Sequence, residues 1–144
     1  MSEGAFSIMG ISASALEAQS HRMRVIAANI ANANTTQDAN GEVYRRREVV
    51  FQEELGSRIG PRRHNQEDLR GVRVKNTIED PSSLQRAYRP GHPEADDEGF
   101  VTLPNINPME EMVDMMVATR SYEANVAAMK TARSIMLKAL EIGK

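Results

Sequence analysis

The chain has 144 residues, the usual size of one domain, and a net charge of only −2, which argues against a general affinity for nucleic acid or anionic lipid. It contains no cysteine, so disulfides and thiol chemistry are excluded. With three Phe, three Tyr and no Trp against nine Met, the composition favours thin, adaptable helix contacts and an elongated shape over a large aromatic core.

The N-terminal segment shows no targeting or membrane pattern. It lacks a basic start followed by a continuous apolar segment, and no run approaches the ~20 apolar residues of a membrane span. If the protein leaves the cytoplasm, we expect it to do so with neither a cleaved signal peptide nor a membrane anchor.

A long amphipathic helix is predicted at the N-terminal end. Apolar residues recur every three or four positions, which predicts a helix over about residues 5 to 33. The stripe includes Ile8, Ile11, Met23, Ile26 and Ile30. The Asn-rich segment that follows, ending in Asn40-Gly41, supplies stop and turn chemistry.

Three asparagines stand together in NIANANTT, residues 29 to 36. Asn34 and Asn32 can account for the helix stop. Asn29 lies one turn earlier and shares a helix face with Asn32. Because an amide both donates and accepts hydrogen bonds, it can bridge to another chain. From the residues alone, one cap and one neutral surface amide is the favoured interpretation, and a contact between Asn29 and a neighbouring subunit is what the family resemblance given below implies.

The middle of the chain is predicted to be β-rich. Residues 41–55, GEVYRRREVVFQEEL, have the β-branched and aromatic content of a strand, and GVRVKNTIED at residues 71–80 alternates more cleanly. Two short strands are expected around Tyr88 and at residues 100–103, joined by a Pro-Gly and acidic turn. Residues 55–70 lack periodicity and are predicted to form a mobile loop.

A second long helix is predicted from Pro108 onward, with Glu110 and Glu111 favourably placed in its first turn. Its apolar residues average a 3.5-residue period, that of coiled coils. This stripe consists of Met112, Met116, Thr119, Tyr122, Val126, Met129, Ala132, Met136 and Leu140. A second apolar set occupies another side: Val113, Val117, Ala124, Ala128, Ile135 and Ile142.

Two apolar stripes need two neighbours. A helix buried within its own domain is one interpretation, but the intervening chain is too short and too polar to cover both helices. The predicted fold is α+β, with two long terminal helices pairing as an elongated coiled-coil-like hairpin around a small β-rich insert. We divide the chain into residues 1–36, 37–107 and 108–144.

No convergent chemistry is visible in the sequence. The histidines His21, His64 and His92 are scattered, and none has a partner at metal-ligand spacing. The nearest approach to a metal cluster is His92 with Asp96, Asp97 and Glu98, and its spacing matches no calcium loop. Arg45, Arg46 and Arg47 alternate between two faces of a strand and form no phosphate or nucleic-acid patch. We therefore expect no enzyme activity, no cofactor and no metal.

The two ends together resemble the axial proteins of the bacterial flagellum. The resemblance rests on NIANANTT at the end of the first helix and on RSYEANVAAMKTARSIMLKALEIG in the last helix. The segment from Glu79 to Val126 narrows it to the proximal rod, and the likeness extends over nearly all of the chain.

That resemblance implies a structural subunit exported unfolded through the flagellar type III apparatus and assembled as a helical tube across the periplasm. Its terminal helices would pack inside the tube, around the export channel, and the rod would transmit motor torque. The implied partners are copies of itself, other proximal and distal rod proteins and the rod-ring junction protein. An alternative is a cytoplasmic two-helix adaptor that binds a partner helix through its Met-rich stripe.

The expected assembly interface combines the stripes of both helices with the asparagines. It comprises Ile8, Ile11, Met23, Ile26, Asn29, Ile30, Asn32, Asn34, Met112, Met116, Tyr122, Asn125, Val126, Met129, Met136 and Leu140.

Overall fold

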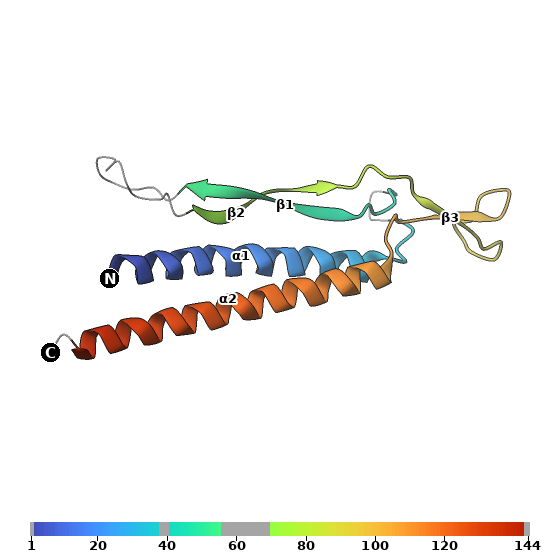
Figure 1. The fold of residues 1–144 in the computed structure, drawn as a ribbon. Coiled ribbons are helices and arrows are strands. Elements are labelled where there is room, and N and C mark those ends of the chain that lie inside the picture. The colour runs from blue at the N-terminus through green and yellow to red at the C-terminus, as the bar shows by residue number, and fades with distance from the viewer. Residues whose placement is uncertain (1, 38–40, 56–69, 143–144) are drawn as a thin grey trace.

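The fold consists of two long helices and two small antiparallel sheets. The computed structural model describes residues 2–37, 41–55 and 70–142. In chain order the elements are α1 (Ser2–Asn32), β1 (Arg47–Leu55), β2 (Arg70–Glu79), β3 (Gln85–Tyr88), β4 (Phe100–Leu103) and α2 (Pro108–Ile142). Helix α1 lies between the β1–β2 ribbon and α2, so the body has three layers (Figure 1). The predicted α+β class is confirmed.

The two helices run antiparallel along each other. Side chains from successive turns pair in opposite order, with Asn29 bonded to Glu111 and Arg22 bonded to Asp114. Small residues occupy buried positions on both helices, since Ala18 and Ala118 are 2% and 0% exposed, and Thr119 of α2 meets the Met23 sulfur of α1. Alanines permit close approach of two helix backbones but bury little apolar surface.

The contact face of α2 begins one residue earlier than the sequence pattern indicated. The buried positions are Glu111, Ala118 and Ala132, while Met112 and Met116 at the start of the predicted stripe are exposed. Seven residues separate the first two buried positions, which is the spacing of one helix face, but this face lies one residue ahead of the predicted stripe there. The predicted stripe was built from apolar residues, so it could not include the buried Glu111.

The β1–β2 ribbon is held against α1 by a close backbone approach. The Ser14 hydroxyl accepts a hydrogen bond from the Val72 amide at 3.2 Å and donates to the Ile11 carbonyl at 2.8 Å. A Cβ added to the neighbouring Gly71 would lie 2.8 Å from the Ser14 oxygen. Glycine at position 71 is therefore what allows the strand to lie this close to the helix.

Strand β1 starts later than predicted, at Arg47 rather than near residue 41. Just before it, the Arg46 amide donates to the Asn105 side chain, and the Arg46 carbonyl accepts from Asp80. The other three strands lie within one or two residues of their predicted places. The predicted loop at 55–70 falls on residues 56–69, which lie outside the described residues.

The β3–β4 hairpin extends beyond the end of the helix pair, away from both termini (Figure 1). Tyr88 and Phe100 lie opposite each other in the ladder, and their rings meet edge to face at 5.3 Å between centroids. The chain then passes through the buried Pro104 and Ile106 into α2. Neither described helix is long and apolar enough to cross a membrane.

Helix α2 starts at Pro108 as the sequence predicted, and it carries a side-chain cap that the sequence analysis did not identify. The Asn107 side-chain oxygen accepts the Met109 amide at 3.1 Å, Pro108 occupies the first helical position, and Glu110 and Glu111 follow in the first turn. The Asn107 side chain thus gives an acceptor to the Met109 backbone N–H, which has no partner within the helix. This cap fixes where the chain leaves the hairpin and enters the helix.

Removing this cap should destabilise α2. We expect Asn107→Ala to cost about 1 kcal/mol of helix stability, because one N-terminal amide loses its acceptor. The effect would appear as lower far-ultraviolet ellipticity and a lower midpoint in thermal unfolding. Asn107→Asp keeps the acceptor and serves as the control. Equal ellipticity and midpoints for all three proteins would contradict the capping role.

Candidate assembly interface and its polar junction

Asn29 lies at the centre of a buried polar junction. It is 1% exposed, and its amide nitrogen donates to the Arg47 carbonyl at 2.9 Å and to the Glu111 carboxylate at 3.0 Å. Its oxygen accepts from the Arg47 amide at 3.0 Å and from the Tyr44 hydroxyl at 3.2 Å. All four hydrogen-bonding positions of the amide are therefore used within the chain.

These contacts change the interpretation of the asparagine-rich segment. The partners of Asn29 come from its own subunit, so no neighbouring chain is needed to explain its amide. Asn32 also bonds locally, donating to the Ala28 carbonyl and accepting from the Thr35 hydroxyl, which ends the helix. Asn34 follows the helix and is exposed.

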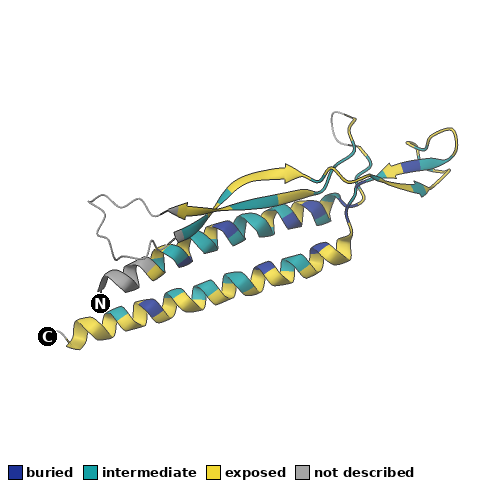
Figure 2. Ribbon diagram, turned by 45° about the horizontal axis from the view of Figure 1, so that its top comes forward, coloured by how far each residue is buried: buried dark blue, intermediate teal, exposed yellow. Residues whose placement is uncertain are grey.

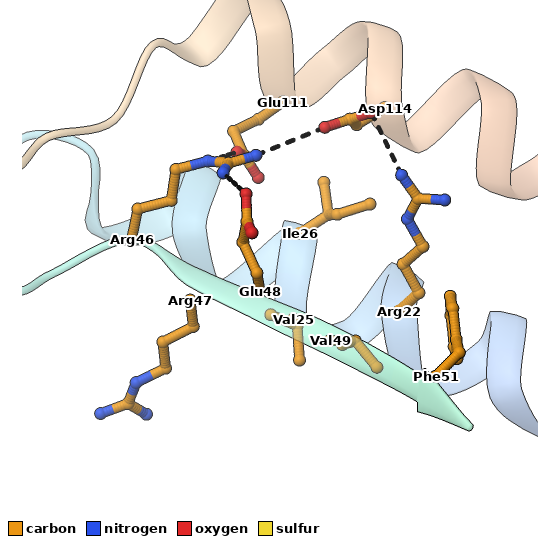
Figure 3. Close-up of a pocket in the computed structure, with 10 residues that line it drawn as sticks. All are labelled: Arg22, Val25, Ile26, Arg46, Arg47, Glu48, Val49, Phe51, Glu111 and Asp114. Atoms are coloured by element: carbon orange, nitrogen blue, oxygen red, sulfur yellow. Dashed lines mark hydrogen bonds and ion pairs between the residues drawn. The ribbon is translucent and has the colours of Figure 1, made fainter. Parts of the chain in front are cut away.

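Arg46 joins the same junction from the segment before β1 (Figure 3). Its Nε atom donates to Glu111 at 2.6 Å, and its two terminal nitrogens reach Glu48 and, at 3.5 Å, Asp114. Arg22 of α1 bonds the other oxygen of Asp114 at 3.3 Å. Two arginines and three carboxylates thus link α1, α2 and the start of the ribbon.

Burial shapes the charges at this junction. Burial alone would lower the pKa of Arg46, but the hydrogen bonds that it donates to Glu111 and Glu48 raise this pKa above its ordinary value. The guanidinium therefore remains charged opposite Glu111, which is 1% exposed. Burial also raises the pKa of Tyr44, so its hydroxyl keeps the proton that it donates to Asn29.

A groove of about 260 Å³ opens beside the junction (Figure 3). Its apolar lining comes from Val25 and Ile26 of α1 and from Val49 and Phe51 of β1. The remaining lining side chains are charged: Arg22, Arg46, Arg47, Glu48, Glu111 and Asp114. The three positive and three negative side chains cancel in charge, and most are already paired with each other. The groove therefore connects the helices and the ribbon and offers few free charges to a ligand.

Metal ligation finds no support in the described residues. No group of three His, Asp or Glu side chains is arranged there to hold an ion. Asp96, in the acidic turn after His92, instead accepts hydrogen bonds from the Glu98 and Phe100 amides. That carboxylate shapes a turn.

Helix α2 carries most of the exposed large hydrophobic side chains in the described chain, from both of its apolar stripes (Figure 2). Twelve large hydrophobic side chains are more than 40% exposed, and nine of them belong to α2. The nine are Met109, Met112, Val113, Met116, Val117, Ile135, Leu137, Leu140 and Ile142. We call this set the α2 outer face. Exposed apolar patches of this kind mark surfaces that another molecule covers.

The predicted second stripe of α2 is fully exposed. All six of its residues, including Val113, Val117 and Ile135, lie on the surface. The sequence argument that this stripe needs a neighbour other than α1 therefore agrees with the fold. The identity of that neighbour stays a prediction.

The predicted interface residues fall into three groups. Ile26 and Asn29 are buried within the subunit. Half-buried are Ile11, Met23, Ile30, Asn32, Tyr122, Asn125, Val126, Met129 and Met136. Exposed are Ile8, Asn34, Met112, Met116 and Leu140. The last group is free to contact other subunits, whereas the buried pair is already covered within its own subunit.

Sequence reasoning missed Arg46 and Glu111 as partners. Glu111 was attributed to the helix dipole and Arg46 to a strand that alternates between faces. One signal was available, because Glu111 precedes Ala118 by seven residues and so shares its side of the helix. Nothing in the local sequence of Arg46 indicated a contact 65 positions away.

Comparison of the sequence with known proteins identifies its family. A family model described as "Flagella basal body rod protein" matches residues 9–37, and one described as "Flagellar basal body rod FlgEFG protein C-terminal" matches residues 97–142. The flagellar basal-body rod protein FlgC of Bacillus subtilis is 43% identical over 148 residues, covering 97% of this chain and 99% of that protein. The chain belongs to the FlgC family.

Other FlgC relatives give the same result. The protein from Yersinia enterocolitica is 41% identical, covering 95% of this chain and 96% of the relative. That from Borreliella burgdorferi is 38% identical, with 96% and 97% covered. The FlgC family consists of structural rod proteins and not of enzymes, so membership identifies a structural rod subunit and favours it over the two-helix adaptor.

The two family models coincide with parts of the structure already described. The first match, residues 9–37, covers most of α1, including Asn29, and the residues that follow the helix. The second match covers the end of the β3–β4 turn, β4 and α2. Glu111 and the α2 outer face lie within the second match. The polar junction therefore joins the two segments on which the rod-protein resemblance rests.

The junction predicts unequal effects for its carboxylates. Glu111→Ala should cost about 2 kcal/mol in the free energy of unfolding, because the Arg46 guanidinium and the Asn29 amide lose a buried acceptor. Glu48→Ala removes a carboxylate whose side chain is 50% exposed, so we expect at most about 0.5 kcal/mol.

Urea unfolding followed by ellipticity would measure both variants. Limited proteolysis would provide a second measurement, because loss of the junction should release the segment before β1 and expose it to cleavage. Equal costs for the two variants would contradict a buried, central role for Glu111.

Proposed function

We propose that this chain assembles with other rod proteins into the helical tube of the proximal rod, where it encloses the export channel and transmits motor torque. The α2 outer face carries the proposal, because it is a long apolar surface that the subunit itself leaves uncovered. A head-to-tail contact that does not close generates a filament. Neighbouring subunits that cover this face through such a contact would build the tube.

The helix pair suits such a role. Its antiparallel packing and seven-residue spacing support a coiled-coil-like hairpin as the unit that enters the tube wall. The β-rich insert, fixed to α1 by Ser14 and Asn29, would then lie on the other side of the wall. Torque applied to the helices would reach the insert through the polar junction.

Location and partners follow from the same proposal. The subunit would reach the periplasm through the flagellar type III apparatus without a cleaved signal, and would contact copies of itself, proximal and distal rod proteins and the rod-ring junction protein. Interface residues on the exposed side would include Ile8, Met112, Met116 and Leu140. Detection of the protein in purified basal bodies tests the location, and its presence in the cytosol alone would contradict it.

A charge on the α2 outer face should block assembly without unfolding the subunit. We expect Val117→Glu to reduce completed basal bodies and motility at least tenfold, because an apolar contact worth about 1.5 kcal/mol is replaced by a carboxylate that would be buried unpaired. The assay is complementation of a strain that lacks the gene. Subunit ellipticity should not change, since Val117 is 49% exposed.

A matched control is available on the ribbon. Ile78 of β2 is 42% exposed, so Ile78→Glu places the same charge at a similarly exposed apolar position outside α2. We expect this variant to retain motility. Normal motility of Val117→Glu would remove the α2 outer face from the assembly interface.

The isolated subunit should be only partly helical. Most of the buried apolar residues of its helices are alanines, and an isolated helix gains most of its stability from packing. We expect low ellipticity in dilute solution and a gain of helix on association with rod partners, followed by far-ultraviolet circular dichroism. A monomer that is fully helical and protease-resistant at every concentration would contradict this expectation.

A further inference from the structure

The hydrogen bonds of Arg47 show which backbone groups of β1 point away from β2. Both the amide and the carbonyl of this residue bond to the Asn29 side chain of α1, at 3.0 and 2.9 Å. In an antiparallel ladder, residues that bond across the ladder alternate with residues that do not. The preceding Arg46 bonds across it, since its carbonyl accepts the Asp80 amide at 2.8 Å. Arg47 therefore directs its backbone groups to the outer edge of β1.

The same alternation places the backbone groups of Val49 and Phe51 on this outer edge. Val49 lies opposite Thr77, and the register shift before Phe51 comes from an extra residue on β2, so the order along β1 is unbroken. The Val72 amide of β2 also leaves the ladder and donates to Ser14, as the alternation requires. In the described part of the chain β1 pairs only with β2, so the outward groups of Val49 and Phe51 have no partner there.

The twist of the ribbon leaves this stretch of edge open. Near the start of β1, Asn29 of α1 bonds the β1 edge at Arg47. Toward the other end, Ser14 of α1 bonds the opposite edge, at Val72 of β2. The ribbon thus turns one edge and then the other toward the helix, as twisted strands do. Between these two anchors, α1 bonds neither edge within the described residues.

The open edge borders the groove of about 260 Å³ beside the polar junction (Figure 3). Val49 and Phe51 line this groove from β1, and Val25 and Ile26 line it from α1. Unpaired backbone groups therefore lie next to an apolar floor. An open strand edge is a template for a further strand, and a neighbouring pocket can accept one of its side chains.

The charges around the groove are already satisfied within the subunit, so they favour an uncharged partner. A charged segment would find no free counter-charge among them. Every charged residue that lines the groove forms an ion pair: Arg22 with Asp114, Arg46 with Glu48, Glu111 and Asp114, and Arg47 with Glu79.

The described chain does not supply such a segment from a second copy of itself. Its four strands are all paired, and the extended stretch before α2 has Pro104 and Ile106 buried. In the stretch before β1, Tyr44 and Arg46 belong to the polar junction. The remaining connections among the described residues carry few apolar side chains. The segment that fits the groove is therefore assigned to a different protein.

We infer that an extended, uncharged segment of another rod protein adds to β1 as a third strand. Its backbone exchanges hydrogen bonds with the outward amide and carbonyl groups of Val49 and Phe51. One of its apolar side chains lies in the groove on Val25 and Ile26. In this mode of recognition, backbone bonds give affinity and the pocket gives specificity. The inference rests on the proposed assembly and adds to it the kind of segment that the ribbon binds.

A proline at position 49 tests the backbone pairing. Proline lacks the amide hydrogen, and an edge strand tolerates it where the N–H faces outward. We expect Val49→Pro to reduce completed basal bodies about tenfold in a strain lacking the gene, because a hydrogen bond to the third strand is lost. Val49→Thr keeps the amide and the β-branched shape, so we expect it to assemble within about twofold of wild type.

The matched control is Thr77→Pro. Thr77 lies opposite Val49, so its amide points to the outer edge of β2 by the same alternation. Both prolines perturb the ribbon at the same rung of the ladder, but only one lies on the β1 edge. We expect Thr77→Pro to assemble within about twofold of wild type. Equal urea midpoints of the two purified variants would show that they cost the subunit the same stability.

A photoreactive side chain identifies the occupant of the groove without relying on a proline. Replacing Phe51 by p-benzoylphenylalanine places a reactive ring in the groove. Irradiation of purified basal bodies should then link this position to an extended segment of another rod protein, located by mass spectrometry. The same replacement at Lys75, which is exposed on β2, is the control and should not give this product.

The outcomes separate this inference from the proposed function. Three results would overturn the third strand while leaving the rod subunit in place: wild-type assembly of Val49→Pro, equal losses for this variant and either Val49→Thr or Thr77→Pro, or no cross-link to another rod protein. A cross-link to a helix or to a second copy of this chain would overturn it as well. Absence of the unmodified protein from purified basal bodies would instead overturn the proposed function itself.

Discussion

A buried carboxylate at the start of α2 organises the subunit. Glu111 is 1% exposed, and a buried charge is stable only where partners surround it. Those partners are Arg46, from the segment before β1, and Asn29, from the last turns of α1. The hydrogen bonds that these two residues donate to Glu111 hold the two helices and the start of the ribbon together in one orientation. The helix contact alone would leave that orientation weakly specified.

The junction divides the surfaces of the helices between folding and assembly. Helix α1 is covered by α2 on one side and by the ribbon on the other, while among the described helices and strands α2 packs only against α1, with Arg46 added at its start. Its opposite side therefore keeps Val113, Val117 and Ile135 in solvent. A subunit that satisfies its buried polar groups internally and leaves an apolar face exposed is suited to addition onto a growing structure. The β3–β4 hairpin packs against none of the other described helices and strands, although Val101 within it is only 1% exposed.

Much of the fold followed from periodicity, and the site did not. Two helices, four strands and the Pro108 start were predictable because each depends on local spacing, capping and turn residues. The phase of the α2 stripe failed at Glu111, since a hydrophobic pattern cannot register a buried acid. The four hydrogen bonds of Asn29 go to three residues 15 to 82 positions away, and such contacts leave no trace in a local pattern.

Asn29 shows why an unexplained polar residue should be assigned to the subunit before it is assigned to a partner. Its amide has two donors and two acceptor sites, and a site at which all four are met must position several backbone and side-chain groups at once. That requirement is easier to satisfy inside one folded chain than across a lattice whose subunits must first find their register. A saturated amide then fixes how the two helices and the ribbon meet once they have formed. What remains for neighbouring subunits includes apolar coverage of α2, which would also stabilise its helix.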